Sequence, residues 1–425
     1  MLTSLFTGVS GMNANGTALS VIGDNIANMN TVGFKASRTC FGDVLSQTLT
    51  GVAGSSQVGR GVVVSGVSPL FTQGSLQSTQ SALDLAIEGD GFFIVSDGAS
   101  KYYTRAGQFS LDKDGNISNS DGLILQGFLA DAGGNITSQT GPLQLAATQS
   151  PAKMTEKVSL GVNLEASEAA KTWAFTSPSA TPPDPASYNK STTLTLYDSQ
   201  GDAHDVTAHF VKTGDNAWTA HYVFQDATGQ YVEAGSQNLA FDTDGSLVND
   251  NNAAIAFNWG PAVAAGSITF NYGTGTGETP AGTGLDGTTQ FSSPFSVLSQ
   301  SQDGYGAGSL KNVSISEDGI VTGIFTNGQT REIGQVILAR FIAPERLTKL
   351  GRNLYGESYD SGQAISGTPE TSGLGRLLAN TLEQSNVDLA QEFVNMIAAQ
   401  RGFQANSRVI TTTDQLMQEL VNLKQ

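Results

Sequence analysis

The stretch LEQSNVDLAQEFVNMIAAQRGFQANSRVITTTDQLMQELVNL, residues 382–423, carries a long heptad repeat. Its apolar residues fall every seven positions, at Leu382, Leu389, Met396, Phe403, Ile410 and Met417. Seven residues nearly match two helical turns, so the repeat places these side chains along one face of a helix. The stretch therefore predicts a terminal helix with one apolar seam.

The stretch LTSLFTGVSGMNANGTALSVIGDNIAN, residues 2–28, repeats this pattern near the other end of the chain. Its seam residues are Leu5, Met12, Leu19 and Ile26. Four glycines interrupt it, and each costs about 1 kcal/mol relative to Ala in a helix interior. Only Asp24 is charged before Phe34, so the polar face lacks the salt bridges of a solvated coiled coil. We expect the two helices to pair and to become ordered when copies of the chain surround them. The alternative is an amphipathic pair packed on its own globular domain.

The composition indicates a turn-rich β protein. Of 425 residues, 39% are hydrophobic, 14% are charged and 50 are Gly. The net charge of −17 disfavours nucleic acid and anionic membranes as partners. No apolar run reaches the ~18 residues of a membrane span. The N-terminal stretch does not resemble a secretory signal peptide, so an extracellular protein of this kind needs another export route. Cys40 is the sole cysteine, which excludes an intrachain disulfide framework.

Short strands are predicted between the terminal stretches. Residues 62–67, 92–95, 192–197, 205–212 and 218–224 are rich in β-branched and aromatic side chains, and Asp-Gly or Gly-rich turns separate such runs. Residues 335–341 form the strongest strand by composition. The predicted fold class is mainly β with a terminal α-helical coiled-coil pair, and with nested discontinuous β-domains between the helices.

If the two terminal helices pair, the predicted domains are nested, because an early and a late segment of the chain then form one domain. The terminal helical coiled-coil domain comprises residues 1–32 with 382–425, and an extended connector comprises 33–72 with 372–381. An inner β-domain comprises 73–150 with 308–371. An outer β-domain comprises 155–305, and its Pro-rich and Gly/Thr-rich segments, 176–188 and 273–287, are predicted surface loops.

No set of residues supports catalysis or metal binding. Asp112 to Gly115 and Asp242 to Gly245 resemble the start of a calcium loop, but Leu123 and Ala253 stand where that loop needs a bidentate Glu. His209 and His221 can face each other across a predicted hairpin, without an evident third ligand. We therefore expect a non-enzyme without a metal or cofactor.

Several segments together resemble the signatures of the bacterial flagellar rod and hook protein family. The N-terminal signature residues are Asn25, Ala27, Asn28, Asn30, Thr31, Gly33, Phe34 and Lys35. The C-terminal ones are Ser385, Asn386, Val387, Asp388, Gln400, Arg401, Ala405 and Asn406. Residues 83–93, 103–107 and 353–355 match as well. The chain departs from the family at Gly402 and Phe403, where Ala and Tyr are usual. A Gly402→Ala change is therefore expected to stiffen the helix and to stabilise an assembly.

The middle block decides the branch of the family. Residues 155–305 resemble the outer domain of hook members, which the shorter distal rod members lack. The resemblance implies a subunit of a curved tube that transmits torque from the motor rod to the filament and encloses the export channel. The alternatives are a distal rod subunit and a secreted adhesin or carbohydrate-binding module.

Partners and location also follow from the resemblance. The implied partners are copies of the chain, distal rod proteins and hook–filament junction proteins at the ends of the tube, and the hook cap and flagellar type III export apparatus during assembly. Neither nucleic acid nor membrane insertion is expected. The implied location is extracellular, in the flagellar basal body and hook, with export that needs no cleaved signal peptide.

Overall fold

The computed structural model describes residues 2–44, 47–51, 54–131, 133–145, 149–261, 263–278 and 280–422. It is mainly β, with a helix near each end, as the sequence predicted. The chain divides into two compact units. Unit 1 comprises Met1–Thr148, Asn312–Ile324 and Thr330–Gln425, and unit 2 comprises Gln149–Lys311 and Phe325–Gln329. The finer division into four domains stays a prediction. In the described part of the chain, no helix is both long and apolar enough to cross a membrane.

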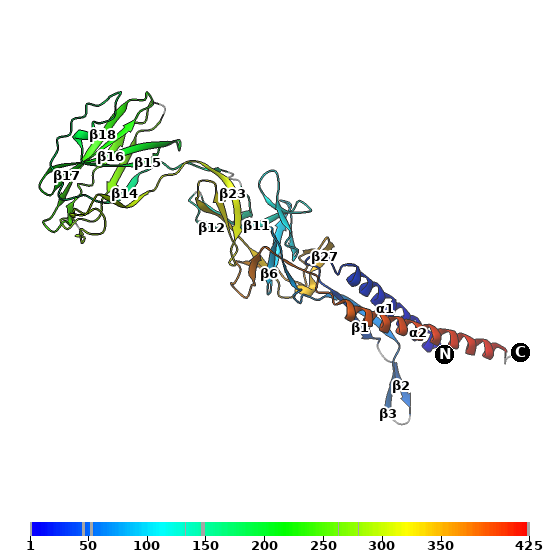
Figure 1. Ribbon diagram of the computed structural model, residues 1–425. Helices are drawn as coiled ribbons and strands as arrows, with labels where there is room; N and C mark the ends of the chain where they lie inside the picture. The colour runs from blue at the N-terminus through cyan, green and yellow to red at the C-terminus, as the bar shows by residue number, and fades with distance from the viewer. Residues whose placement is uncertain are drawn as a thin grey trace. The chain divides into compact units, whose positions relative to one another are not determined.

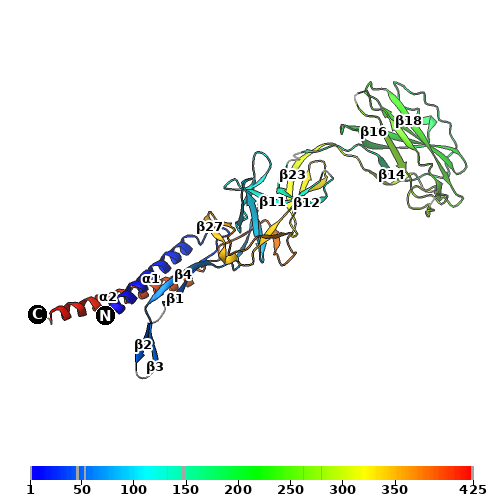
Figure 2. The ribbon, with the colours of Figure 1, turned by 180° about the vertical axis from the view of Figure 1, so that it is seen from behind.

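The terminal helices of unit 1 lie side by side and antiparallel (Figures 1 and 2). Helix α1 spans Leu2–Ala27 and helix α2 spans Leu389–Asn422. The prediction that the second helix begins at Leu382 is wrong, because Leu382 lies in strand β31, Thr381–Glu383, which pairs with β5, Leu76–Ser78. The helix begins later because the Asp388 carboxylate accepts hydrogen bonds from the Ala390 and Gln391 amides, which caps its first turn. The predicted end at Leu423 lies outside the described residues.

Two antiparallel strand pairs follow α1. Strand β1, Ser37–Asp43, pairs with β4, Val62–Pro69, and β2, Gln47–Gly51, pairs with β3, Gly54–Val58. The strand predicted over residues 62–67 is confirmed as part of β4, and the rest of the predicted connector 33–72 contains β1, β2 and β3 as well. The β-branched residues Val62, Val63, Val64 and Val67 favour strand pairing over a plain linker.

The β part of unit 1 is built from both halves of the chain. Its early strands are β6 (Leu85–Glu88), β7 (Phe92–Ser96), β8 (Lys101–Thr104), β9 (Phe109–Leu111), β10 (Ile117–Asn119), β11 (Ile124–Ala130) and β12 (Ile136–Pro142). Its late strands are β24 (Ile320–Phe325), β25 (Thr330–Val336), β26 (Leu338–Arg340), β27 (Thr348–Gly351), β28 (Leu354–Gly356), β29 (Ile365–Gly367) and β30 (Arg376–Ala379). A short 3-10 helix, Pro344–Arg346, lies between β26 and β27.

Late strands pair directly with early ones in this part. Strand β25 pairs with β11, β26 with β7, β28 with β8, and β30 with β6. An aromatic cluster lies beneath them, with Tyr103 and Phe341 ring centres 4.8 Å apart and Phe71 and Phe92 centres 5.1 Å apart. The single strand predicted over 335–341 is wrong, because the chain changes partner from β11 to β7 at Ile337.

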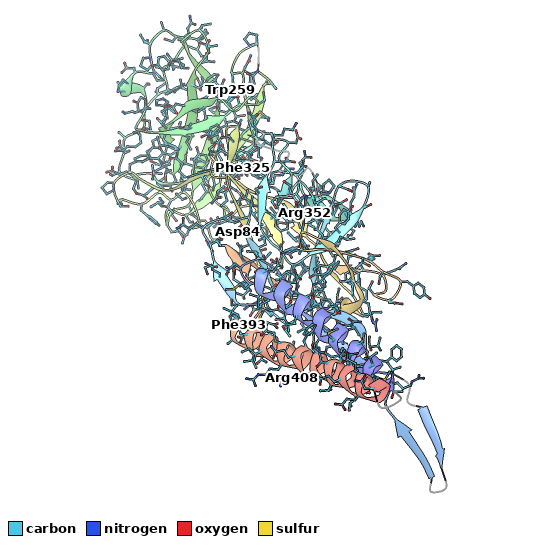
Figure 3. All side chains as sticks on the ribbon, turned by 90° about the vertical axis from the view of Figure 1, so that its right-hand side faces the viewer. Asp84, Trp259, Phe325, Arg352, Phe393 and Arg408 are labelled. Atoms are coloured by element: carbon cyan, nitrogen blue, oxygen red, sulfur yellow. The ribbon has the colours of Figure 1, made fainter. Side chains whose placement is uncertain are left out.

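Unit 2 contains two sheets around one aromatic core. One sheet has the order β20-β21-β14-β22 and the other β15-β16-β17-β18-β19. The strands are β14 (Lys157–Asn163), β15 (Lys190–Tyr197), β16 (Ala203–Gly214), β17 (Ala217–Gln225), β18 (Tyr231–Phe241), β19 (Leu247–Asn249), β20 (Ala254–Phe257), β21 (Gly266–Asn271) and β22 (Ser296–Gln302). The two-residue strand β13, Gln149–Ser150, pairs with the eight-residue strand β23, Gly308–Ile315. Trp218, Phe210, Phe270 and Tyr272 are fully buried in the core, and Trp259, labelled in Figure 3, belongs to the same core.

The predicted turns are confirmed at the hairpins. The β16–β17 turn has Asn216 at φ 56°. In the β9–β10 hairpin, the Asp112 carboxylate accepts hydrogen bonds from the Asp114 and Asn116 amides, so it closes a turn. At the second calcium-like segment, the Gly245 amide donates to the Asp242 carbonyl, again within a turn.

His209 and His221 are directly opposite each other on β16 and β17, as the sequence predicted. The His209 ring packs on Tyr188 with ring centres 4.4 Å apart. The His221 Nδ1 atom lies 2.7 Å from the Glu233 carboxylate. Burial lowers the pKa of His209 to about 4, and the charge of His221 adds to that lowering while Glu233 opposes it.

The lowered pKa of His209 predicts that the free energy of unfolding of unit 2 falls in mild acid. The pKa of His209 is depressed in the fold, so the unfolded chain takes up a proton first as the pH falls from about 6.5 toward 4. The loss reaches at most about 2 kcal/mol at pH 5. Urea unfolding followed by tryptophan fluorescence measures it, since all three tryptophans lie in unit 2.

The variant His209→Gln is the control for this loss. It is expected to gain stability relative to the wild type between pH 7 and pH 5, because glutamine does not titrate. An unchanged difference between variant and wild type over that range would contradict the assignment to His209.

Candidate assembly site

Small residues form the contact between the terminal helices. Gly8, Gly11, Ala14 and Ala18 are the buried residues of α1 along most of its length, and Ala399 is their counterpart on α2. A Cβ atom added to Gly11 would lie 2.6 Å from the Asn406 Oδ1 atom, and one added to Gly8 would lie 3.0 Å from Ile410 Cγ1. Glycine at these two positions therefore leaves room for the Asn406 and Ile410 side chains of α2.

Each helix places one asparagine side chain against a glycine of the other helix, Asn15 against Gly402 and Asn406 against Gly11. The Asn15 Nδ2 group donates to the Gly11 carbonyl at 2.7 Å, and the Asn406 Nδ2 group donates to the Gly402 carbonyl at 2.9 Å. Each asparagine bonds back to its own helix and lies against the glycine of the other helix, since a Cβ on Gly402 would lie 2.7 Å from Asn15 Oδ1. The expectation that Gly402→Ala stabilises the assembly stays a prediction, and the structure adds an opposing steric cost, because an added Cβ meets the Asn15 side chain. Glycine at 402 makes room for Asn15.

The heptad residues are less buried than predicted. Leu5, Met12, Leu19, Ile26, Leu389, Met396 and Ile410 are partly buried, whereas Phe403 is 38% and Met417 is 40% exposed. The buried line of α1 runs beside the predicted seam, because the glycines and alanines allow the closer approach. Large seam residues lie at the flanks of the contact.

Large apolar side chains remain uncovered on both helices. Phe393, Val394 and Ile397 are 47%, 60% and 51% exposed. With 3.6 residues per turn, they lie on the side of α2 away from Ala399 and α1. Leu416 is 53% exposed and Phe6, on α1, is 67% exposed. Phe393 is near the start of α2 and Arg408 further along in Figure 3.

One buried carboxylate joins the base of the helices to the β part of unit 1. The Glu383 Oε1 atom lies 2.6 Å from the Lys35 ammonium and accepts a hydrogen bond from the Gly74 amide at 2.9 Å. The Glu383 Oε2 atom lies 3.4 Å from the Arg105 guanidinium. The side chains of Lys35 and Glu383 are fully buried, and that of Arg105 is 3% exposed.

The buried charges of this junction depend on one another. Burial lowers the pKa of Lys35, and Arg105 lowers it further, whereas the charge and hydrogen bond of Glu383 oppose both. Burial likewise lowers the pKa of Arg105 against the attraction of Glu383. The Lys35 ammonium also donates to the Thr72 carbonyl at 2.7 Å, and Arg105 donates to the Gly89 carbonyl at 2.8 Å. One carboxylate therefore compensates two buried cations.

Three signature-region asparagines bind backbone groups at the same junction. Asn25, 1% exposed, both accepts from and donates to the backbone of Ser37. Asn386 accepts from the Ala36 amide at 2.8 Å and donates to the Leu70 carbonyl at 2.8 Å. Asn353 donates to the Val32 carbonyl. The Asn386 bonds join the segment that follows α1 to the segment that precedes α2, and the Asn353 bond joins the former to the turn between β27 and β28.

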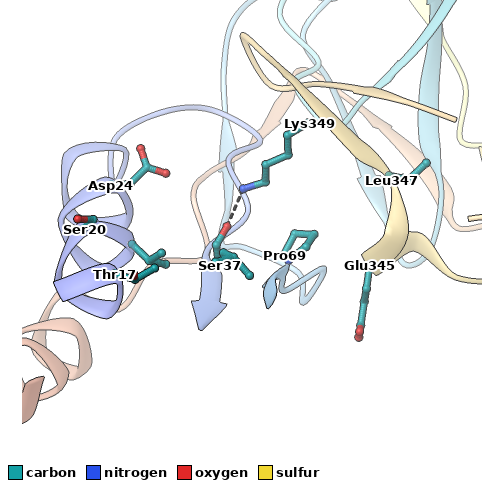
Figure 4. A pocket seen from close by; sticks show the side chains of 10 residues that line it. Thr17, Ser20, Asp24, Ser37, Pro69, Glu345, Leu347 and Lys349 are labelled. Carbon is teal, nitrogen blue, oxygen red and sulfur yellow. Dashed lines mark hydrogen bonds between the residues drawn. The ribbon is translucent and has the colours of Figure 1, made fainter. Parts of the chain in front are cut away.

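A pocket of about 440 Å³ opens between α1, β1 and the β27 region (Figure 4). The Lys349 ammonium donates to Ser37 Oγ at 2.6 Å and lies 5.5 Å from the centre of the Phe34 ring. Burial lowers the pKa of Lys349, and the charge of Asp24 opposes that effect. The pocket thus belongs to the same junction.

The structure brings most N-terminal signature residues to this junction. Phe34 and Lys35 are buried, and Gly33 has φ 69° with no room for a Cβ, which would lie 2.5 Å from the Ala106 amide nitrogen. Asn28 donates to Asp24 and accepts from Thr31, whereas Ala27 and Asn30 are exposed.

The C-terminal signature residues divide between the junction and α2. Ser385 and Val387 are partly buried beside Asn386, and Asp388 caps α2. Gln400, Arg401 and Ala405 are exposed on α2, away from the junction. The sequence pattern missed Glu383 and Arg105 as site residues. The feature of the sequence that could have pointed to Glu383 is its position directly after the apolar heptad residue Leu382.

Four family models match successive parts of the chain. They are described as Flagella basal body rod protein (residues 5–35), Flagellar hook protein FlgE/F/G D1 domain (86–161), Flagellar basal body protein FlaE D2 domain (163–305) and Flagellar basal body rod FlgEFG protein C-terminal (378–423).

Curated relatives match over the full length. The chain is 38% identical to the Flagellar hook protein FlgE of Escherichia coli K12 over 98% of both chains, and 36% identical to that of Borreliella burgdorferi over 100% of both. A crystal structure of Helicobacter pylori flagellar hook protein FlgE2 has a TM-score of 0.50 at 15% identity. It covers 72% of this chain and 100% of its own, which indicates a shared fold.

Neutralising Glu383 is expected to destabilise unit 1. The change Glu383→Gln leaves Lys35 and Arg105 buried without a carboxylate, which costs about 3–5 kcal/mol. Hydrogen exchange of the peptides that contain β30 and β31 measures the loss. Tryptophan fluorescence of unit 2 is expected to stay unchanged.

Glu88→Gln is the matched control for that variant. It removes one carboxylate from the ion pair with Arg376, in which both side chains are over 40% exposed, so the expected loss is below about 1 kcal/mol. Equal protection of β30 and β31 in the two variants would contradict a special role for Glu383.

Substitution by alanine is expected to change the stability of the helix pair in opposite directions at Gly11, which contacts α2, and at Gly16, which does not. Gly11→Ala must displace the Asn406 amide and weaken the helix pair, whereas nothing lies within 4 Å of a Cβ at Gly16. Gly16→Ala is expected to stabilise α1 by up to about 1 kcal/mol. Helical circular dichroism during thermal unfolding compares them, and the same sign of change for both would refute the close contact.

Proposed function

The chain belongs to the flagellar hook protein family, and we propose that it polymerises into the curved tubular hook, as a flexible joint that transmits torque from the motor rod to the filament. The observation that carries this proposal is the row of apolar side chains left uncovered on α2. Full burial of Phe393, Val394 and Ile397 is worth about 1.5–3 kcal/mol each, and they are half exposed here. Copies of the chain that cover this row recover that free energy, so the row favours lateral association.

The contact within one helix pair is too small to hold both helices firmly by itself. Among the described residues, its buried apolar cluster consists of Ala18, Ile22 and Ala399, with Leu19, Ile26 and Met396 packed against it. Ordering each residue costs about 1–2 kcal/mol of backbone entropy. We therefore propose that the terminal helices become fully ordered on assembly, where neighbouring copies add contacts.

The same helices suit the inner wall of a tube around the export channel. Asp24 is the one charged residue of α1, so this helix offers a passing unfolded chain little fixed charge to bind. A partly ordered pair of helices also allows the subunit itself to travel unfolded through the channel, by flagellar type III export and without a cleaved signal peptide.

Unit 2 suits an outer layer whose contacts change as the hook bends. Strand β22 is exposed along nearly its whole length and carries Ser and Gln among few apolar residues. Such surfaces exchange one neighbour contact for another at low cost. The remaining proposed partners are distal rod and hook–filament junction proteins at the ends, and the hook cap during growth.

Polar substitution of the uncovered row is expected to prevent polymerisation. The double change Val394→Ser with Ile397→Ser removes apolar surface that one chain leaves exposed, so the monomer loses at most about 0.5 kcal/mol per site. Sedimentation and negative-stain microscopy measure assembly. The wild type is expected to form curved hollow tubes, in which hydrogen exchange of α1 slows.

Gln391→Ser, at an exposed position of α2 that lies outside the face of the uncovered row, is the control and is expected to polymerise normally. Tubes of normal yield from the double variant would remove the argument from the uncovered row, and wild-type oligomers without a tubular form would refute the hook proposal.

A further inference from the structure

Two carboxyl groups of unit 2 face each other in a buried site that the assembly does not use. Asp250 follows β19 and is 1% exposed. Its Oδ2 atom accepts a hydrogen bond from the Tyr272 amide at 3.1 Å. Its Oδ1 atom and the Glu278 Oε1 atom are both buried without a hydrogen-bond donor among the described residues.

The groups around Asp250 favour its neutral form. Burial raises the pKa of Asp250, and the charge and hydrogen bond of Glu278 raise it further, while the Tyr272 amide opposes this. The other titratable groups that face it are the phenols of Tyr222 and Tyr272 in the core, whose own pKa values burial raises. No lysine, arginine or histidine is among the described groups that act on Asp250.

Two carboxylates in contact cannot both stay ionised without a positive species between them. A metal ion is disfavoured, because the described residues include no group of three or more acidic, His or Cys side chains around one point. Calcium takes six to eight oxygen ligands, and magnesium needs a near-octahedral set. A proton needs only the two oxygens that lack a donor.

We propose that Asp250 and Glu278 bind one proton between them and that this shared proton holds the loop segment 273–278 on the core of unit 2. The loop joins β21 to the segment before β22 and carries Glu278. Its Thr276 and Gly277 amides donate to the Leu247 and Val248 carbonyls. The carboxyl pair adds a contact between side chains to these backbone hydrogen bonds. Loss of the proton places two negative charges inside that contact and loosens the loop.

The pH dependence follows from the raised pKa of Asp250. Between the ordinary aspartate value and the folded value, the native state keeps a proton that the unfolded chain has lost. The stabilisation is therefore complete at acidic pH and is lost as the pH rises through the folded pKa. This sense is opposite to that of His209.

The change Asp250→Asn tests the shared proton in the full chain. Its amide nitrogen takes the place of Oδ1 and donates to Glu278 permanently, while its oxygen still accepts from Tyr272. The thermal unfolding midpoint of unit 2, followed by tryptophan fluorescence, is expected to rise by about 3 °C or more over the wild type at pH 8. The difference is expected to shrink as the pH falls and to vanish only below the ordinary aspartate value of about 4. Titration of His209 cancels, because it is common to both proteins.

Glu278→Gln is expected to act in the same direction, and it keeps the test valid if Asp250→Asn folds poorly. Asp286→Asn is the control for the loss of an exposed carboxylate charge in the same loop. The asparagine oxygen can keep the hydrogen bond from the Thr274 amide, so the midpoint is expected to change less than in the two amide variants at pH 8. A lower midpoint for both amide variants at pH 8 would overturn the proposal. A calcium chloride-dependent rise of the wild-type midpoint that both variants lose would overturn it as well, in favour of a cation.

Discussion

The arrangement of unit 1 depends on the compensation of two buried cations by Glu383. Lys35, Gly74 and Arg105 come from three separate segments, and all three meet the same carboxylate. A buried ion set of this kind contributes little net stability when complete, but removal of one partner is severely unfavourable. Its effect is therefore on specificity. The base of α1 and the strand before α2 have one permitted alignment, and the Gly33 amide bonded to the Glu383 carbonyl reinforces it.

The helix pair above this junction separates two kinds of surface. Glycine and alanine face inward, where two backbones lie close together, and Phe393, Val394 and Ile397 face outward. A monomeric coiled coil would place its large side chains in the opposite way. This inversion makes the isolated pair narrow and leaves its apolar surface for neighbours, which fits a chain whose working state is a polymer.

The sequence predicted the parts of the fold that depend on local signals and missed those that depend on distant partners. The heptads correctly located α1 and α2, and the Asp-Gly turns correctly located hairpins, because both signals are local. Leu382 was assigned to the helix because its apolar character fits the repeat, whereas its pairing with β5 depends on a segment some three hundred positions earlier. The role of Glu383 and the space that Gly402 leaves for Asn15 are likewise set by distant partners. Periodicity also cannot distinguish a seam that faces its own chain from one that faces another copy, which is why the buried line of α1 was displaced.

The separation of the junction residues along the chain has a consequence for synthesis. Lys35 and Glu383 are 348 positions apart, and Arg105 and Glu383 are 278 apart. A ribosome therefore completes both cations long before their carboxylate emerges. A nascent or prematurely terminated chain cannot close unit 1, whereas unit 2 has all its strands once Gln329 has been made. A chain that ends before β31 therefore lacks the one carboxylate that compensates Lys35 and Arg105.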